Sequence, residues 1–382
     1  MIRPTGELTY TTAEEAISSR LCCRHVVPVT RPRFLAPRQK GAGPGSRRWP
    51  RSPILARVAH PIIVTGGAGF IGSNLVDALN RRGHDDVVVV DHVEDDPAKR
   101  RNLERLRVGE YFDKRAFRDR LRAGKAPTAS AVFHLGACSS TTETDEGYLR
   151  DNNTDYTREL CEWSLKKGAR FIYASSAATY GDGSLGYSDD DAVTPTLRPL
   201  NLYGASKQWF DLWALQTGAL RQVAGIKYFN VYGPWEDHKG DMRSLVNKAY
   251  AQVLRDGEIT LFKSYRTEFK DGEQQRDFIH VDDAVAVTLF FLDRPDVSGL
   301  FNCGTGVART WVDLAKALFS ALARPPRIRF IDMPESIREK YQYHTQADMT
   351  KLRARGYSAP FLQIEDGVRH YVQEYLKPQS AR

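Results

Sequence analysis

Residues 61–72 have the sequence Pro-Ile-Ile-Val-Thr-Gly-Gly-Ala-Gly-Phe-Ile-Gly, in which a short apolar run leads into a glycine-rich turn. The apolar run is typical of a buried strand, and the apolar positions that follow predict a helix over 73–82. Val87-Val-Val-Val90 predicts a second buried strand, which ends at Asp91. A strand, a helix and a strand within about 30 residues indicate a βαβ unit.

The alternation of strands and helices continues beyond this unit. Apolar runs predict strands at 131–135, 171–174 and 225–231, and periodic segments predict helices at 153–167 and 203–217. Continuous apolar strands that alternate with helices favour a parallel sheet covered on both faces. The predicted fold class is therefore α/β, with a Rossmann-type doubly wound parallel sheet.

The regular alternation ends near Pro234, and the later chain predicts a smaller interleaved α/β substrate lobe. We expect the ligand site in the crevice between the sheet and this lobe, beyond the carboxyl ends of the strands. The predicted domains are a disordered basic extension over 1–59, a dinucleotide-binding Rossmann domain over 60–233 and 277–310, and a substrate-binding lobe over 234–276 and 311–378.

The net charge of +8 over 382 residues comes entirely from the start of the chain. Of 55 Lys+Arg and 47 Asp+Glu, the first 60 residues hold 11 and 3, which leaves 44 of each in the rest. We therefore expect no nucleic-acid partner. The basic extension fits a tail, an Arg-rich targeting peptide or, as we favour, a dispensable segment.

Two further absences concern the membrane and metals. No apolar run reaches the roughly 20 residues that cross a bilayer, so we expect no membrane partner. The five cysteines have no metal-ligand spacing, and their odd number argues against a disulfide framework. We accordingly predict no metal site, and a reducing cytoplasm as the location.

The glycine turn predicts a dinucleotide site. Gly66 permits a tight turn, Gly69 lets the backbone approach a pyrophosphate, and Gly72 lets the helix pack on the sheet. Asp91, 19 positions after Gly72, is placed to accept a hydrogen bond from a ribose 2′-hydroxyl, which favours NAD. Lys99 and the two arginines after it could instead pair with a 2′-phosphate, which favours NADP. These residues alone leave both cofactors open.

Tyr203 and Lys207 form a candidate proton-transfer pair, because they lie one helical turn apart on the same face. Free tyrosine titrates near 10, so it is a poor base at neutral pH unless nearby positive charge favours the phenolate. Lys207 supplies such a charge and could also bind the nicotinamide ribose. Ser176 ends the preceding strand and is placed to contact the reacting oxygen. The plainer interpretations are a surface Tyr/Lys pair and a strand-end serine cap.

These motifs resemble the extended short-chain dehydrogenase/reductase superfamily. A closer resemblance, over about residues 61 to 375, is to the family of ADP-L-glycero-D-manno-heptose 6-epimerases. It is carried by Gly136-Ala-Cys-Ser-Ser-Thr-Thr-Glu143, Ala174-Ser-Ser-Ala-Ala-Thr-Tyr-Gly181, Tyr228-Phe-Asn-Val-Tyr-Gly-Pro234 with His238-Lys-Gly240, Arg276-Asp-Phe-Ile-His-Val-Asp-Asp283, and Tyr341 with Thr345-Gln-Ala-Asp348.

The resemblance implies an isomerase that inverts C6 of the heptose in ADP-D-glycero-D-manno-heptose, for the lipopolysaccharide core. It implies transient oxidation to a 6-keto intermediate with bound NADP, hydride return to the opposite face, and a homo-oligomer, typically a pentamer. It also implies that Lys239 is a second proton carrier beside Tyr203. Without the resemblance, Lys239 would be interpreted as a solvated loop lysine.

The resemblance also implies ligand contacts. Lys99 becomes the expected phosphate partner, so NADP is favoured over NAD. Asp241 and Lys248 stand where some members have a serine and a histidine. The implied cofactor contacts are Phe70, Ile71, Asp91, His92, Lys99, Lys114, Leu135, Gly136, Ala137, Cys138, Ser139, Asn152 and Val231, and the implied substrate contacts are Asn230, Asp241, Lys248, Phe262, Lys263, Ser264, Tyr265, Arg276 and Tyr341.

Other functions fit parts of the pattern. A UDP-hexose 4-epimerase would share Tyr203 and Lys207 but would not need Lys239. A dehydratase is less favoured, because Ser176-Ala-Ala-Thr-Tyr180 lacks the carboxylates that its added acid/base pair requires. A non-catalytic cofactor sensor on the same fold is the alternative from another functional class. Arg276 suits a diphosphate because its planar fork can bind two oxygens, although it could also bridge the two lobes.

Overall fold

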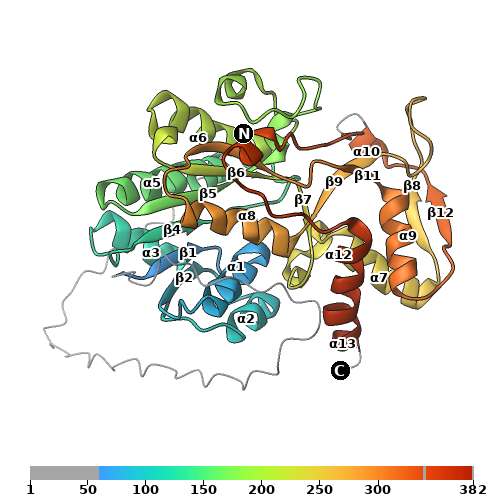
Figure 1. Ribbon diagram of the computed structural model, residues 1–382, viewed down its shortest axis with the longest axis horizontal. Helices are drawn as coiled ribbons and strands as arrows, with labels where there is room; N and C mark the ends of the chain where they lie inside the picture. The colour runs from blue at the N-terminus through green and yellow to red at the C-terminus, as the bar shows by residue number, and fades with distance from the viewer. Residues whose placement is uncertain (1–59, 339–340, 381–382) are drawn as a thin grey trace, which may run out of the picture. The chain divides into compact units, whose positions relative to one another are not determined.

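The computed structural model describes residues 60–338 and 341–380. The predicted extension, residues 1–59, lies outside them. The centre of the fold is a seven-stranded sheet in the order β10-β6-β5-β4-β1-β2-β3, and every neighbouring pair is parallel (Figure 1). Its strands are β1 (Ile62–Thr65), β2 (Val87–Asp91), β3 (Glu110–Asp113), β4 (Ala131–His134), β5 (Arg170–Ser176), β6 (Ala224–Tyr228) and β10 (Gly299–Cys303).

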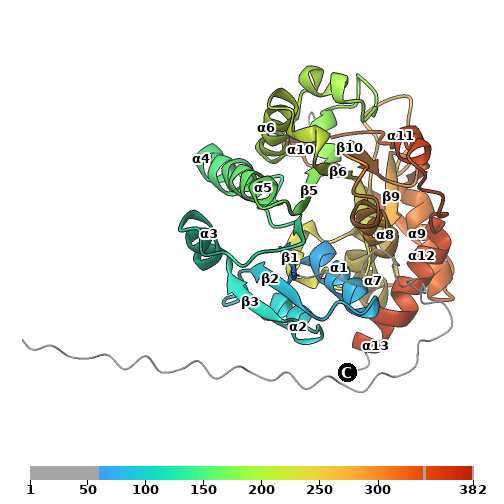
Figure 2. The same cartoon turned by 60° about the vertical axis from the view of Figure 1, so that its left-hand side comes forward.

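Helices cover both faces of this sheet (Figure 2). One face carries α1 (Phe70–Arg81), α2 (Pro97–Glu104) and α8 (Val281–Asp293), and the other carries α3 (Lys114–Arg122), α4 (Glu146–Leu149), α5 (Tyr156–Lys166) and α6 (Leu202–Gln216). A π-helix, η2 (Arg150–Asp155), joins α4 to α5. The prediction of an α/β fold with a doubly wound parallel sheet is confirmed.

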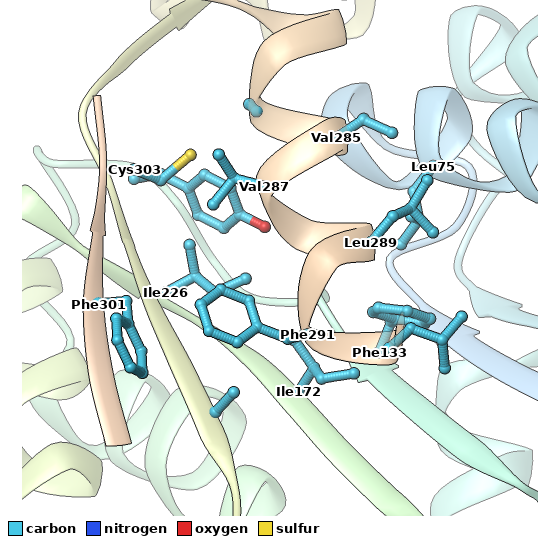
Figure 3. Packing of buried hydrophobic residues seen from close by; sticks show 14 of the residues in the cluster. Leu75, Phe133, Ile172, Ile226, Val285, Val287, Leu289, Phe291, Phe301 and Cys303 are labelled. Carbon is cyan, nitrogen blue, oxygen red and sulfur yellow. The ribbon is translucent and has the colours of Figure 1, made fainter. Parts of the chain in front are cut away.

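The strands alternate their side chains between two cores, as a strand buried on both faces must. Ile62 and Val64 of β1 belong to the core under α1 and α8, whereas Ile63 belongs to the core under α3, α5 and α6. Figure 3 shows the first core, where Leu75 of α1 and Leu289 of α8 point toward each other. All of these side chains are at most 1 % exposed.

A smaller lobe is built from two minor sheets and the C-terminal helices. One sheet has the order β11-β9-β7 and the other pairs β12 with β8. A third core lies here. The elements are β7 (Asn230–Tyr232), β8 (Ile259–Phe262), β9 (Gln275–His280), β11 (Ala308–Thr310), β12 (Ile328–Ile331), α7 (Leu245–Asp256), α9 (Trp311–Ala321), α10 (Glu335–Arg338), α11 (Thr350–Ala354), α12 (Ile364–Tyr371), the π-helix η7 (Val372–Leu376) and α13 (Lys377–Ser380).

Several elements differ from the sequence-based prediction. The strand predicted at 225–231 is divided between β6 and β7, which belong to different sheets because the chain leaves the large sheet at Phe229. Residues 281–293, for which no element was predicted, form helix α8 against the face of the large sheet. Strands β9 and β11 lie in the smaller three-stranded sheet. The boundaries of the two predicted domains remain a prediction. Within the described residues, no helix combines the length and hydropathy needed to cross a bilayer.

Candidate active site

The glycine turn is packed so tightly that two of its positions exclude a side chain. Gly66 has a φ of 69°, and a Cβ there would lie 2.6 Å from the backbone nitrogen of Gly136. At Gly72 a Cβ would lie 2.0 Å from the carbonyl oxygen of Gly66. The turn therefore lies directly against the segment after β4, at the point where the strand order reverses. This edge is where doubly wound sheets bind their ligands.

The N-terminus of α1 is open to an anion. Gly69 is its N-cap residue and supplies no side-chain hydrogen bond, and the first turn contains no acidic residue. The first N–H groups of a helix have no partner within the helix, so they suit a pyrophosphate. A Cβ on Gly69 would lie only 3.9 Å from His238 Nε2, so the loop at 238 lies close to the turn. The predicted contacts Phe70 and Ile71 begin this helix.

Asp91, at the end of β2, ties the turn to Lys99. Its Oδ2 accepts a hydrogen bond from the Ala68 backbone N–H at 2.9 Å. Its Oδ1 accepts from the His92 N–H at 2.7 Å and from Lys99 Nζ at 2.9 Å. The carboxylate is buried, whereas the Lys99 side chain keeps 26 % of its surface exposed. A carboxylate and an ammonium thus stand together where the cofactor ribose is expected.

Further predicted cofactor residues gather around the ends of β2, β3 and β4. His92 Nδ1 lies 2.9 Å from Asp113 Oδ2, and that hydrogen bond raises the pKa of His92. Lys114, the first residue of α3, donates to Asn152 Oδ1 on η2 at 3.2 Å. The remaining predicted contacts on this side are Leu135, Gly136, Ala137, Cys138 and Ser139, which follow β4 directly.

The predicted proton-transfer group assembles where β5 ends beside α6. The Ser176 side chain interacts with that of Tyr203, and its Oγ accepts a hydrogen bond from the Ala178 N–H at 3.1 Å. Ser176 therefore both contacts Tyr203 and caps the end of the strand. Burial raises the pKa of Tyr203, and the interaction with Ser176 opposes that rise. In this state Tyr203 is a proton donor, and it needs added positive charge to become a base.

Lys207 is one turn further along α6 and is only 5 % exposed. Burial lowers its pKa to about 8, and the Asp211 carboxylate opposes this shift. Because this value lies above neutral pH, Lys207 remains largely an ammonium at pH 7. It therefore supplies the positive charge that a Tyr203 phenolate requires.

Lys239 approaches the start of α1, next to the glycine turn, from a loop that follows the large sheet's strand β6 in the sequence. It lies in the 3₁₀ segment η6 (Asp237–Met242), and its Nζ is 5.1 Å from the centre of the Phe70 ring. Burial lowers the pKa of Lys239, while Glu236 raises it and Lys248 lowers it further. The side chain is partly buried and directed at the start of α1, so it is not a freely solvated loop lysine.

A second cluster surrounds Arg276 of β9. The Arg276 guanidinium lies 5.1 Å from the Tyr341 ring centre and 5.7 Å from that of Trp311. The Phe262 and Tyr341 rings meet edge-on at 6.4 Å. Burial lowers the pKa of Arg276, which is only 7 % exposed. A buried cation between aromatic faces suits a phosphate next to a planar base.

The other predicted substrate residues are more exposed. Lys263 Nζ and the Tyr265 hydroxyl both donate to Asp332 Oδ1, at 3.2 and 3.1 Å, and Ser264 lies between them. Lys248 is exposed and donates to the Asp241 backbone oxygen at 3.0 Å. Asn230 and Val231 lie on β7. The ligand roles of all these residues remain predictions.

Comparison with known proteins places this geometry in a family. The model of the NAD dependent epimerase/dehydratase family matches residues 62–304. A protein of Nitratidesulfovibrio vulgaris named ADP-L-glycero-D-manno-heptose-6-epimerase is 54 % identical over 82 % of this chain and 97 % of its own length. The chain belongs to the NAD dependent epimerase/dehydratase family. Its similarity to the heptose 6-epimerases extends beyond the family match into the C-terminal lobe.

Two solved structures share the fold of this chain. The heptose 6-epimerase of Helicobacter pylori has a TM-score of 0.68 at 27 % identity, covering 82 % of this chain and 96 % of its own. MoeE5, solved in complex with UDP-glucuronic acid and NAD, has a TM-score of 0.66 at 25 % identity, covering 84 % and 99 %. These likenesses support the family assignment.

Sequence reasoning missed two residues that organise the site of this epimerase-family protein. Asn153 on η2 accepts a hydrogen bond from the Cys138 N–H at 2.8 Å and donates to Ser206 Oγ at 2.9 Å. It thereby fixes the segment after β4 against α6, between Tyr203 and Lys207. Its sequence signal was weak, because Asn153 was expected only to begin a helix.

Asp211 is the second missed residue. Its Oδ2 accepts from Ser175 Oγ at 2.6 Å and from Lys227 Nζ at 3.1 Å, and both charged side chains are at most 1 % exposed. Lys227 also donates to Thr179 Oγ1 at 2.7 Å. The buried ion pair thus holds the chain on both sides of Ser176. The available signal was the position of Asp211, one helical turn after Lys207.

Proposed function

We propose that this protein inverts C6 of the heptose in ADP-D-glycero-D-manno-heptose to give ADP-L-glycero-D-manno-heptose, a step toward the lipopolysaccharide core. The names of the relatives support the substrate, with 54 % identity over nearly the whole of one relative. The site supports the chemistry, because Ser176 and Tyr203 lie beside a buried Lys207 and the glycine turn lies at the same sheet edge.

The reaction needs oxidation and reduction, because the C6 hydrogen of a heptose is not acidic and no carbonyl lies beside it. Removal of a proton alone therefore cannot invert this centre. A nicotinamide dinucleotide, which Gly66, Gly69 and Asp91 would hold, would supply reversible hydride transfer at C6. Tyr203 takes the hydroxyl proton from one epimer while Ser176 holds the reacting oxygen.

Two proton carriers follow from the stereochemistry. The hydroxyl oxygen points in different directions in the two epimers, so one fixed base serves only one of them well. Tyr203 extends from α6 beside the end of β5, and Lys239 extends from η6 beside the start of α1. We assign one epimer to each residue. This assignment rests on the implied role of Lys239 together with its approach to the turn.

The function is tested directly with the purified protein and no added cofactor. Incubation with ADP-D-glycero-D-manno-heptose should produce the L-glycero epimer, resolved by chromatography or NMR. UDP-galactose, offered in parallel, should remain unchanged. Conversion of UDP-galactose without conversion of the ADP-heptose would instead favour a UDP-hexose 4-epimerase. Failure to convert either sugar, with bound nicotinamide that never becomes reduced, would favour the non-catalytic sensor.

We propose NADP as the preferred cofactor, with Lys99 as the partner of its 2′-phosphate; NAD remains the alternative. The Lys99 ammonium lies beside Asp91, where the ribose is expected. Lys99→Met should weaken NADP binding by about tenfold or more, since a hydrogen bond to a charged group contributes about 1.5–3 kcal/mol. NAD binding should change little. Calorimetric titration of both cofactors measures this, with Lys125→Met as control, because Lys125 is an exposed lysine to which no ligand role is assigned.

We propose that Arg276 binds the diphosphate of the substrate. Loss of its charge-assisted hydrogen bonds in Arg276→Met should raise the dissociation constant for ADP by about tenfold or more. Arg329→Met is the matched control, because Arg329 pairs with Glu258 at the surface of β12. Unchanged ADP affinity in Arg276→Met would contradict the role. A homo-oligomer, a pentamer by resemblance, remains a further proposal that sedimentation analysis tests.

A further inference from the structure

Glu236 is a buried carboxyl group immediately before the loop that carries Lys239. It is 0 % exposed. Its Oε2 accepts from the Ser244 backbone N–H at 2.6 Å, and its Oε1 accepts from the Ser244 hydroxyl at 2.5 Å. Ser244 is the N-cap residue of α7. Glu236 therefore joins the two ends of the loop at 237–243, from which Lys239 projects.

Helix α12, called the C-terminal helix below, contacts this junction through its last residue, Tyr371. The Tyr371 hydroxyl donates to Glu236 Oε1 at 3.1 Å and accepts from Asn247 Nδ2 at 2.8 Å. The Asp237 carboxylate likewise accepts hydrogen bonds from Asn247 Nδ2, at 3.1 Å, and from the Tyr375 hydroxyl. Tyr371 lies 132 positions after Lys239 and outside the family match at 62–304. The loop conformation thus depends on a part of the chain remote in sequence.

The charges of Glu236 and Lys239 support each other. Burial raises the pKa of Glu236, and Lys239 opposes that rise more than any hydrogen bond does. Burial lowers the pKa of Lys239, and Glu236 is the group that opposes this. The positive charge of Lys248 lowers the pKa of Lys239, whereas the charge of Glu236 raises it. A buried charge is tolerated when a partner and hydrogen bonds compensate it, and Glu236 has both.

We propose that Glu236 is a positioning residue for Lys239 and that the C-terminal helix, through Tyr371, fixes it in that role. The backbone geometry agrees, since the Lys239 N–H donates to the Glu236 carbonyl at 3.0 Å. The inference rests on the proposed function, in which Lys239 carries the proton of one epimer only. A displacement of about 1 Å at a catalytic group can lower a rate by about 10²-fold.

The test measures each epimer separately. The protein with its oxidised cofactor is mixed rapidly with either C6 epimer of the ADP-heptose, and nicotinamide absorbance follows the first turnover. Glu236→Gln should slow the reaction of one epimer by about tenfold or more and leave the other within about twofold. The slowed epimer should be the one slowed by Lys239→Met. Tyr371→Phe should slow the same epimer by a smaller factor.

Glu258→Gln is the matched control, because Glu258 pairs with Arg329 at the surface and should leave both epimers unaffected. Thermal unfolding of each variant shows whether the fold persists, and Tyr371→Phe provides the test if Glu236→Gln does not fold. If folded Glu236→Gln slows both epimers equally, or slows neither, the positioning role of Glu236 is contradicted. The proposed function is not affected by that outcome. If Lys239→Met itself shows no preference between epimers, the two-carrier proposal fails and the inference fails with it.

Discussion

Replacement of Tyr203 by phenylalanine should lower the rate of C6 epimerisation by a factor of roughly 10² or more. The variant loses only the hydroxyl that interacts with Ser176, so the fold and the neighbouring Lys207 should persist. Without the hydroxyl, no group in this position can accept the proton of the reacting alcohol. The measurement is the initial rate of conversion from each epimer at saturating substrate.

Tyr228→Phe is the control for this variant. Tyr228 ends β6, beside Ser176 in the sheet, but its hydroxyl is bonded to Thr288 of α8 at 2.7 Å, within the core. Its loss should decrease the free energy of unfolding by about 1 kcal/mol and leave epimerisation unchanged. Near-normal turnover in Tyr203→Phe would remove Tyr203 from the mechanism.

Replacement of Lys239 by methionine should lower epimerisation by a similar factor of roughly 10² or more. Methionine keeps much of the apolar volume beside Phe70 but removes the ammonium. Since complete inversion uses both proton carriers, conversion should fail in either direction even though Tyr203 is intact. Reaction of one epimer with the bound cofactor should continue, because that half-reaction uses Tyr203.

Lys316→Met is the control for Lys239→Met, because Lys316 is an exposed residue of α9. Normal epimerisation by Lys239→Met would exclude a second proton carrier at this position. It would also favour a reaction in which Tyr203 serves both epimers. Equal loss of both half-reactions would instead indicate that Lys239 supports the site as a whole.

The large sheet was predictable because its determinants are local. Each strand is a short apolar run, and Gly66 and Gly72 are required wherever a strand passes into a helix at such close distances. The minor sheets were less predictable, because β7 and β11 have only three residues each and pair with β9 across long separations in the sequence. Nothing near Phe229 in the sequence marks the exchange from one sheet to another.

In the candidate site, too, the features with local sequence determinants were predictable and those that depend on distant contacts were not. Tyr203 and Lys207 are adjacent on one helix, so their spacing alone predicts a shared face. Lys239 gave no such signal, since it lies in the irregular segment η6 and its approach to Phe70 joins elements that are far apart in the sequence. Asn153 and Asp211 were missed because their partners, Cys138 and Lys227, come from other elements. Tertiary hydrogen bonds of this kind leave no periodic pattern in the sequence.

The most direct test of transient oxidation at C6 uses substrate labelled with deuterium at that carbon. The protein converts the labelled ADP-D-glycero-D-manno-heptose in ordinary water, and mass spectrometry with NMR locates the label in the product. Oxidation with return of the same hydrogen predicts that the deuterium remains at C6 of the inverted sugar. Loss of the label to solvent in step with inversion would contradict this account and would indicate proton exchange.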